Sequence, residues 1–108
     1  IFSRPQKLPE DPNADPGQRV FARSGCGACH TLEGVPGAAG NVGPVLSNIG
    51  NVAETRKPGT SAADYIRESI VNPSAFIAPG FAPVMPAGLV SSPADLDAIV
   101  QYLAKQKK

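Results

Sequence analysis

The clearest amphipathic pattern lies near the end of the chain. Its apolar positions recur at intervals of three and four residues, at Leu96, Ile99, Val100 and Leu103. Ser92 followed by Pro93 supplies a capping side chain and then a first helical residue whose missing N–H costs nothing. We therefore predict a helix over residues 93–106.

Two further helices are predicted upstream by their end signals. Asp15 and Pro16 start a helix over 16–25, with Gly25 suited to a C-terminal cap. Thr60 or Ser61 starts a helix over 61–71, and Ser61 and Asp64 have the spacing of a capping box. Residues 45–50 are expected to form one short helical turn. Since no segment shows a convincing strand period, the predicted fold class is all-α with three main helices.

The segments between these helices are rich in residues that interrupt secondary structure. The 108 residues include 12 prolines and 11 glycines, which predicts long irregular loops over 31–44 and 73–90. Residues 1–14 are expected to be an extended Pro-rich leader or tether, and 15–108 one domain. Because the sequence begins with Ile1, we expect a mature or trimmed protein whose targeting segment or membrane anchor is missing.

Composition narrows the classes of function. The chain has four Phe, two Tyr and no Trp, so its apolar content rests heavily on Ala and Val. A group other than protein is therefore expected to fill part of the core. No apolar run approaches the ~20 residues of a membrane span. The net charge of +1 gives no basic face for nucleic acid, which we do not expect as a partner.

The strongest chemical signal is the segment Cys26-Gly27-Ala28-Cys29-His30, which has the pattern C-x-x-C-H. Two thiols three residues apart at the end of a helix can add to the two vinyl groups of one haem. The adjacent His30 can then supply an axial nitrogen to the iron. The segment therefore predicts one covalently attached haem c, with Cys26, Cys29 and His30 as cofactor-binding residues.

Other interpretations of the two cysteines remain open. A Cys26–Cys29 disulfide in a haem-free module would leave both His30 and the thin core unexplained. A thioredoxin-like redox pair needs a βαβ setting, which the pattern lacks. Structural zinc normally needs four Cys or His ligands, and the chain contains three such residues.

The second axial ligand is restricted by composition. With one histidine in the chain, bis-histidine coordination within a monomer is impossible, and with one methionine a thioether ligand can only be Met85. A lone methionine often fills gaps in a core. Met85 instead lies between Val84 and Pro86 in a Gly/Pro-rich loop, a setting suited to holding one side chain against a cofactor. We predict His30 and Met85 as the iron ligands.

These motifs resemble the class I c-type cytochromes from about Gly17 to Tyr102. Gly17 and Phe21 are similar to the family's first helix, Ile99 and Tyr102 to its last, and Gly43-Pro44-Val45-Leu46 to its G-P-x-L segment. The resemblance implies a cytochrome c fold wrapped around one haem, with the Pro44 carbonyl accepting a hydrogen bond from His30. Residues 60–70, Pro79-Gly80-Phe81 and Met85-Pro86 resemble the single-haem domains of bacterial respiratory complexes, such as subunit II of caa-type oxidases.

The resemblance also implies a function. An iron held by His30 and Met85 suits one-electron transfer rather than substrate conversion, with a quinol-oxidising complex or reaction centre and a terminal oxidase as partners. The expected location is extracytoplasmic, in the periplasm or on the outer face of the cytoplasmic membrane. If Met85 does not bind iron, a peroxidase-like or ligand-binding haem protein is the alternative.

Two surface features remain to be placed by the structure. Many family members hold a haem propionate with a Trp, which this chain lacks; the candidate substitutes are Arg56, Asn48, Asn51 and Tyr65. Small and apolar residues are expected to ring the haem edge and to form a docking patch with weak salt dependence. They are Gly27, Ala28, Phe81, Ala82, Pro83, Val84 and Ala87.

Overall fold

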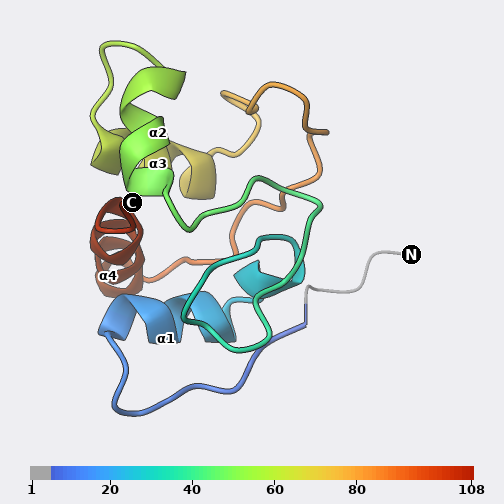
Figure 1. Cartoon of the computed structure of the whole chain (residues 1–108), viewed down its shortest axis with the longest axis vertical. Coiled ribbons are helices and arrows are strands. Elements are labelled where there is room, and N and C mark those ends of the chain that lie inside the picture. Colours follow the sequence, from blue (N-terminus) through green and yellow to red (C-terminus); the bar gives the residue numbers. More distant parts are fainter. Residues whose placement is uncertain (1–5) are drawn as a thin grey trace.

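Helix α4 lies at the centre of the helical arrangement, between α1 on one side and the α2–α3 pair on the other (Figure 1). The computed structural model describes residues 6–108. α1 (Pro16–Arg23) starts at Asp15, whose carboxylate accepts the Gly17 N–H at 2.8 Å. α4 (Pro93–Ala104) starts at Ser92, whose hydroxyl accepts the Asp95 N–H. Both predicted starts are confirmed, while each helix ends two residues before the predicted boundary.

The crossing of α1 and α4 is unusually close because Gly17 has no side chain. A Cβ at this position would collide with Cβ of Tyr102 and with the backbone carbonyl of Ala98. Beside this contact, Phe21 and Ile99 are each 0% exposed and form the centre of the core. The crossing therefore brings the first and last helices together.

α3 (Ala62–Val71) begins one residue after the predicted start at 61 and ends at the predicted residue, 71. The Ser61 hydroxyl accepts the Asp64 N–H at 3.1 Å and so caps the helix. The predicted cap of this helix is therefore present in the folded chain.

α2 (Ile49–Arg56) corrects the sequence prediction, which expected only a short turn over 45–50. Asn48 precedes it without a capping side-chain hydrogen bond, so the usual start signal is absent. The helix is instead fixed by the end of the chain, since the Gly50 N–H donates to the Gln106 carbonyl at 2.9 Å. A tertiary contact that no local pattern encodes therefore establishes this helix.

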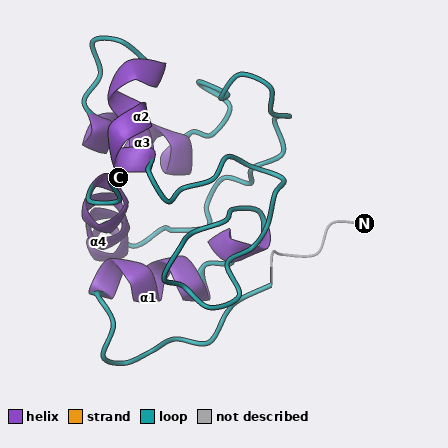
Figure 2. Ribbon diagram, viewed as in Figure 1, coloured by secondary structure: helices purple, strands orange, loops and turns teal. Residues whose placement is uncertain are grey.

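The rest of the described chain is mostly loop, as Figure 2 shows. Within residues 6–108 the extended structure consists of one isolated antiparallel bridge, Thr31 to Ala39. Gly25, in the left-handed region at φ +81°, turns the chain out of α1 into the 3-10 turn η1 (Cys26–Ala28). The all-α prediction is confirmed, with four α-helices in the described part rather than three.

The segment before α1 lies against the domain at two residues. Of the predicted leader over 1–14, residues 1–5 lie outside the described part of the chain. The Leu8 N–H donates to the Ala22 carbonyl at 2.9 Å, and the Leu8 side chain covers Gly27 and Gly37. Glu10 pairs with Arg23 at 3.2 Å. The segment 8–10 therefore packs over the turn that carries the cysteines.

Replacing Gly17 by alanine tests the α1–α4 crossing. The added methyl group would force the helices apart, and we expect the free energy of unfolding to fall by about 2–3 kcal/mol. This loss outweighs the ~1 kcal/mol that alanine gains in helix propensity. Denaturant unfolding measures it, with Gln101→Ala on the exposed face of α4 as the control. Equal stability of the two variants would contradict the close crossing.

Candidate functional site

A large apolar pocket opens between the C-x-x-C-H turn, α3 and the loop over 73–92. It contains about 1140 Å³ of space, including space open to solvent at its mouth. Of the residues that line it, only His30 and Arg56 can carry a positive charge, and none is a carboxylate. Such a pocket suits a large, mostly apolar cofactor.

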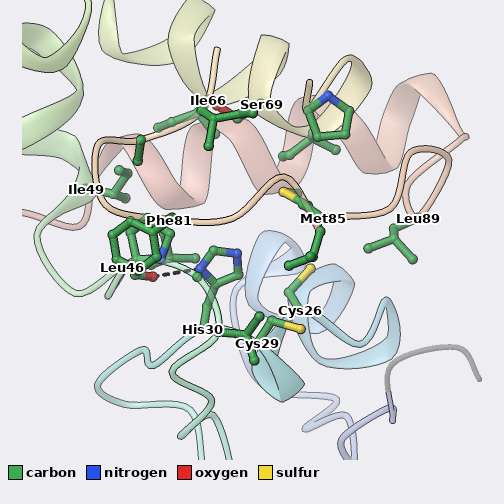
Figure 3. Close-up of a pocket in the computed structure, with 18 of the residues that line it drawn as sticks. Cys26, Cys29, His30, Leu46, Ile49, Ile66, Ser69, Phe81, Met85 and Leu89 are labelled. Carbon is green, nitrogen blue, oxygen red and sulfur yellow. Dashed lines mark hydrogen bonds between the residues drawn. The ribbon is translucent and has the colours of Figure 1, made fainter. Parts of the chain in front are cut away.

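Cys26 and Cys29 lie on one wall of the pocket, at the turn that follows α1 (Figure 3). The turn is held by its own backbone, because the N–H groups of Cys29 and His30 both donate to the Cys26 carbonyl, at 3.2 and 3.0 Å. Both cysteines are free thiols. Burial raises the pKa of the Cys26 thiol to about 11, so this sulfur is protonated at neutral pH.

His30 is buried beside the cysteines and is oriented by Pro44. Its Nδ1 lies 2.7 Å from the Pro44 carbonyl oxygen. A carbonyl can only accept, so Nδ1 carries the proton and donates it, and Nε2 keeps its lone pair. Burial lowers the pKa of the imidazole and thereby favours its neutral form. The ring is therefore held in the tautomer that can bind a metal through Nε2.

Gly43 allows the chain to pass directly over this ring. A Cβ at Gly43 would lie 2.5 Å from Cε1 and 2.9 Å from Nδ1 of His30. The Gly43 N–H donates to the Cys29 carbonyl at 2.8 Å, which ties the loop to the C-x-x-C-H turn. A side chain at position 43 would therefore displace either the ring or the loop.

Met85 reaches the same pocket from the loop over 73–92. In Figure 3 its side chain lies across the pocket from the His30 ring, with Leu89 further along the same loop. The structure thus brings together all five residues singled out in the sequence, since Cys26, Cys29, His30, Pro44 and Met85 all line this pocket.

The candidate residues for holding propionates separate into two pairs. Arg56 and Tyr65 line the pocket, whereas Asn48 and Asn51 do not. The Asn51 side chain is occupied elsewhere, because its Oδ1 accepts the Lys108 N–H at 2.8 Å. Sequence reasoning also missed that Ile66 and Ser69 of α3 form part of the pocket wall. Their helical spacing was the available signal.

The prediction of which residues form the docking patch is partly wrong. Phe81, Ala82, Pro83 and Val84 line the pocket and are exposed, as predicted. Gly27 is buried, because Leu8 and Ala38 cover it. Ala28 and Ala87 are exposed but lie outside the pocket lining. No local pattern in the sequence indicates that Leu8 folds back over the cysteine turn.

Haem c fits these residues. The pocket is apolar, two thiols three residues apart lie on its wall, and a neutral imidazole and a thioether reach it. The family model described as Cytochrome c matches residues 14–107. The chain belongs to the cytochrome c family, and its C-x-x-C pair implies covalently bound haem c.

A search of curated proteins finds no match. Among the helices of residues 6–108, none has both the length and the apolar character needed to cross a bilayer.

Gly43→Ala tests the packing of the loop on His30. We expect the methyl group to push the ring away from Pro44, to lengthen the 2.7 Å hydrogen bond and to lower stability by about 1–3 kcal/mol. Imidazole ¹⁵N chemical shifts report the hydrogen bond, and denaturant unfolding reports stability. Val42→Ala, at a neighbouring exposed side chain, is the control. Unchanged imidazole shifts in Gly43→Ala would contradict this packing.

Proposed function

We propose that this protein is a one-electron carrier in which His30 and Met85 bind the iron of haem c from opposite faces. The observation that carries the proposal is the position of these side chains across one apolar pocket (Figure 3). When bound, haem c supplies reversible one-electron chemistry at its iron. Two protein ligands leave no coordination position for a substrate, which favours a carrier over an enzyme.

Cys26 and Cys29 hold the cofactor in this proposal. Each cysteine would hold the bound haem through one thioether, in which the thiol's sulfur is bonded to one former vinyl carbon and its hydrogen to the other. The short turn between the cysteines supports this role, because it presents both sulfur atoms to the pocket. The attachment needs no oxidant, since the thiols and vinyl groups together supply every atom of the two thioethers.

His30 and Met85 set the electronic properties of the site. The Pro44 carbonyl accepts the Nδ1–H of His30, which fixes the ring and raises the basicity of Nε2. The neutral thioether of Met85 favours ferrous iron. The apolar wall disfavours the additional positive charge of the ferric state. The thioether of Met85 and the apolar wall therefore both favour a high reduction potential, whereas the basic imidazole of His30 does not.

Met85→Ala tests the ligand assignment on the holoprotein. We expect the far-red sulfur-to-iron band of the oxidised protein to disappear. The reduction potential should fall by a sizeable part of the ~0.8 V range that axial ligands span. Leu89→Ala, also on the pocket wall, removes a side chain without sulfur and should keep the band.

The wild-type protein separates the carrier from the alternative function. A wild-type spectrum without the band, together with tight binding of CO or cyanide, would instead support the peroxidase-like or ligand-binding haem protein.

The proposed partners are other redox proteins: a quinol-oxidising complex or reaction centre as donor and a terminal oxidase as acceptor. Two stretches that flank the pocket, residues 34–53 and 69–94, contain no charged residue. At the pocket mouth Phe81 is 38% and Val84 is 55% exposed. These features support docking through an uncharged apolar face. We further propose an extracytoplasmic location, where haem c is attached.

Salt dependence tests this docking face. Between about 0.01 M and 0.15 M salt the Debye length falls from ~30 to ~8 Å, yet the rate of electron transfer to an isolated terminal oxidase should change less than about twofold. Val84→Lys should introduce a clear salt dependence, whereas Lys107→Gln, at an exposed residue outside the pocket lining, should not. A steep fall in the wild-type rate with salt would contradict an apolar docking face.

A further inference from the structure

The Met85 loop, residues 73–91, makes few polar contacts with the rest of the protein. Within residues 6–108, each of its backbone hydrogen bonds reaches at most three residues along the chain. Among the described residues, no side-chain hydrogen bond or ion pair involves this loop. From Pro79 to Gly88 every residue is exposed except Met85, which is half-buried. The position of Met85 therefore depends on side chains that pack at the ends of the loop.

The loop on the histidine side of the pocket is held differently. There the Gly43 N–H donates to the Cys29 carbonyl at 2.8 Å, and the Gly40 N–H donates to the Gly27 carbonyl at 3.1 Å. Both acceptors belong to the C-x-x-C-H turn. Hydrogen bonds thus fix the histidine side of the pocket, whereas the methionine side relies on packing.

Phe76 provides the main contact at the start of the Met85 loop. It is half-buried, packs against the core and lines the pocket. Its ring lies edge-on to the buried Tyr65 of α3, with the centroids 5.7 Å apart and the ring planes at 75°. The Lys57 ammonium lies over the same ring, 5.7 Å from its centroid. Both geometries are attractive, so the ring is joined to α3 and to the end of α2.

Lys57 is itself fixed by an ion pair. It follows directly after α2, and its Nζ lies 2.7 Å from Oε1 of Glu68 on α3. Both side chains are 34% exposed, so the pair adds little stability by itself. Its consequence is positional, because it keeps the ammonium over the Phe76 ring. Lys57 lies outside the pocket lining and can act on the site only through Phe76.

We propose that Lys57 and Phe76 are positioning residues that hold the Met85 loop closed over the pocket. The inference rests on the proposed function, in which the Met85 thioether binds iron. When the Phe76 ring leaves Tyr65 and Lys57, the loop loses these contacts with the helices. Met85 can then move away, and a coordination position becomes free for an external ligand. The contact thus keeps the protein a carrier and suppresses ligand binding at the iron.

Imidazole binding to the oxidised holoprotein measures how often the loop opens. Imidazole binds only where Met85 has left the iron, so its binding rate follows the fraction of molecules with an open loop. Phe76→Leu keeps an apolar side chain but removes the ring. It should raise the rate about tenfold, which corresponds to ~1.4 kcal/mol. Phe76→Tyr keeps the ring and should stay within twofold of the wild-type rate.

Oxidation of Met85 gives a second readout that does not depend on ligand binding. Met85 is the only methionine in the sequence, so a mass increase of one oxygen after treatment with a methionine-selective chloramine reports this residue. A thioether held in the pocket is shielded from the oxidant. Phe76→Leu should therefore form the sulfoxide about tenfold faster than the wild type.

The Lys57 variants test the same contact without changing the pocket lining. Lys57→Met keeps the apolar stem and removes the charge, and it should raise both rates about threefold. Lys57→Arg keeps a cation and should restore the wild-type rates. Lys107→Met, at an exposed residue outside the pocket lining, is the matched control and should leave both rates unchanged. These variants decide the question if Phe76→Leu does not retain haem.

Gly17→Ala separates loop opening from a general loss of stability. It weakens the α1–α4 crossing, away from the loop, and should change both rates less than twofold. Equal increases in Gly17→Ala and Phe76→Leu would overturn this inference alone, as would wild-type rates in both Phe76→Leu and Lys57→Met. A wild-type spectrum without the far-red sulfur-to-iron band would overturn the proposed function as well.

Discussion

The hydrogen bond between His30 and the Pro44 carbonyl joins two segments that the rest of the site depends on. At 2.7 Å it ties the C-x-x-C-H turn to the loop over 31–44 and fixes which ring nitrogen carries the proton. Gly43 makes the contact possible, because any side chain there would occupy the space of the ring. The loop therefore positions the imidazole by its backbone, and a residue without a side chain is needed at position 43.

The helices position the C-x-x-C-H turn that carries His30. Gly17 lets α1 and α4 approach closely, and Gly25 then turns the chain so that the cysteines face the pocket. Leu8 packs on the outer side of that turn, over Gly27. Phe21, Ile99 and Leu103 extend from the core to the pocket lining. The core and the cofactor wall are thus one continuous apolar body, which explains how a chain with six aromatic residues can build a domain.

Local signals in the sequence were sufficient to predict helices α1, α3 and α4. They were also sufficient to predict the five candidate cofactor-binding residues that line the pocket. Ser61 and Ser92 cap their helices by contacts that span three residues, so a short motif carries the information. α2 and the position of Leu8 could not be predicted, since both depend on contacts with distant parts of the chain. Gly50 pairs with Gln106, and Leu8 covers Gly27 and Gly37. Four candidate propionate partners were likewise indistinguishable until the pocket separated Arg56 and Tyr65 from the two asparagines.

The charged residues lie away from the two stretches that flank the pocket. The stretches 34–53 and 69–94 around the pocket carry none, while the acidic residues near α1 and α4 are paired with basic neighbours, as in Arg23–Asp95 and Lys105–Asp15. A charge at the exposed mouth would act on both the partner and the iron. Arg56 is half-buried and lines the pocket, so its positive charge lies outside these two uncharged stretches. The charges of the described chain are thus kept apart from the exposed apolar residues at the pocket mouth, Phe81 and Val84.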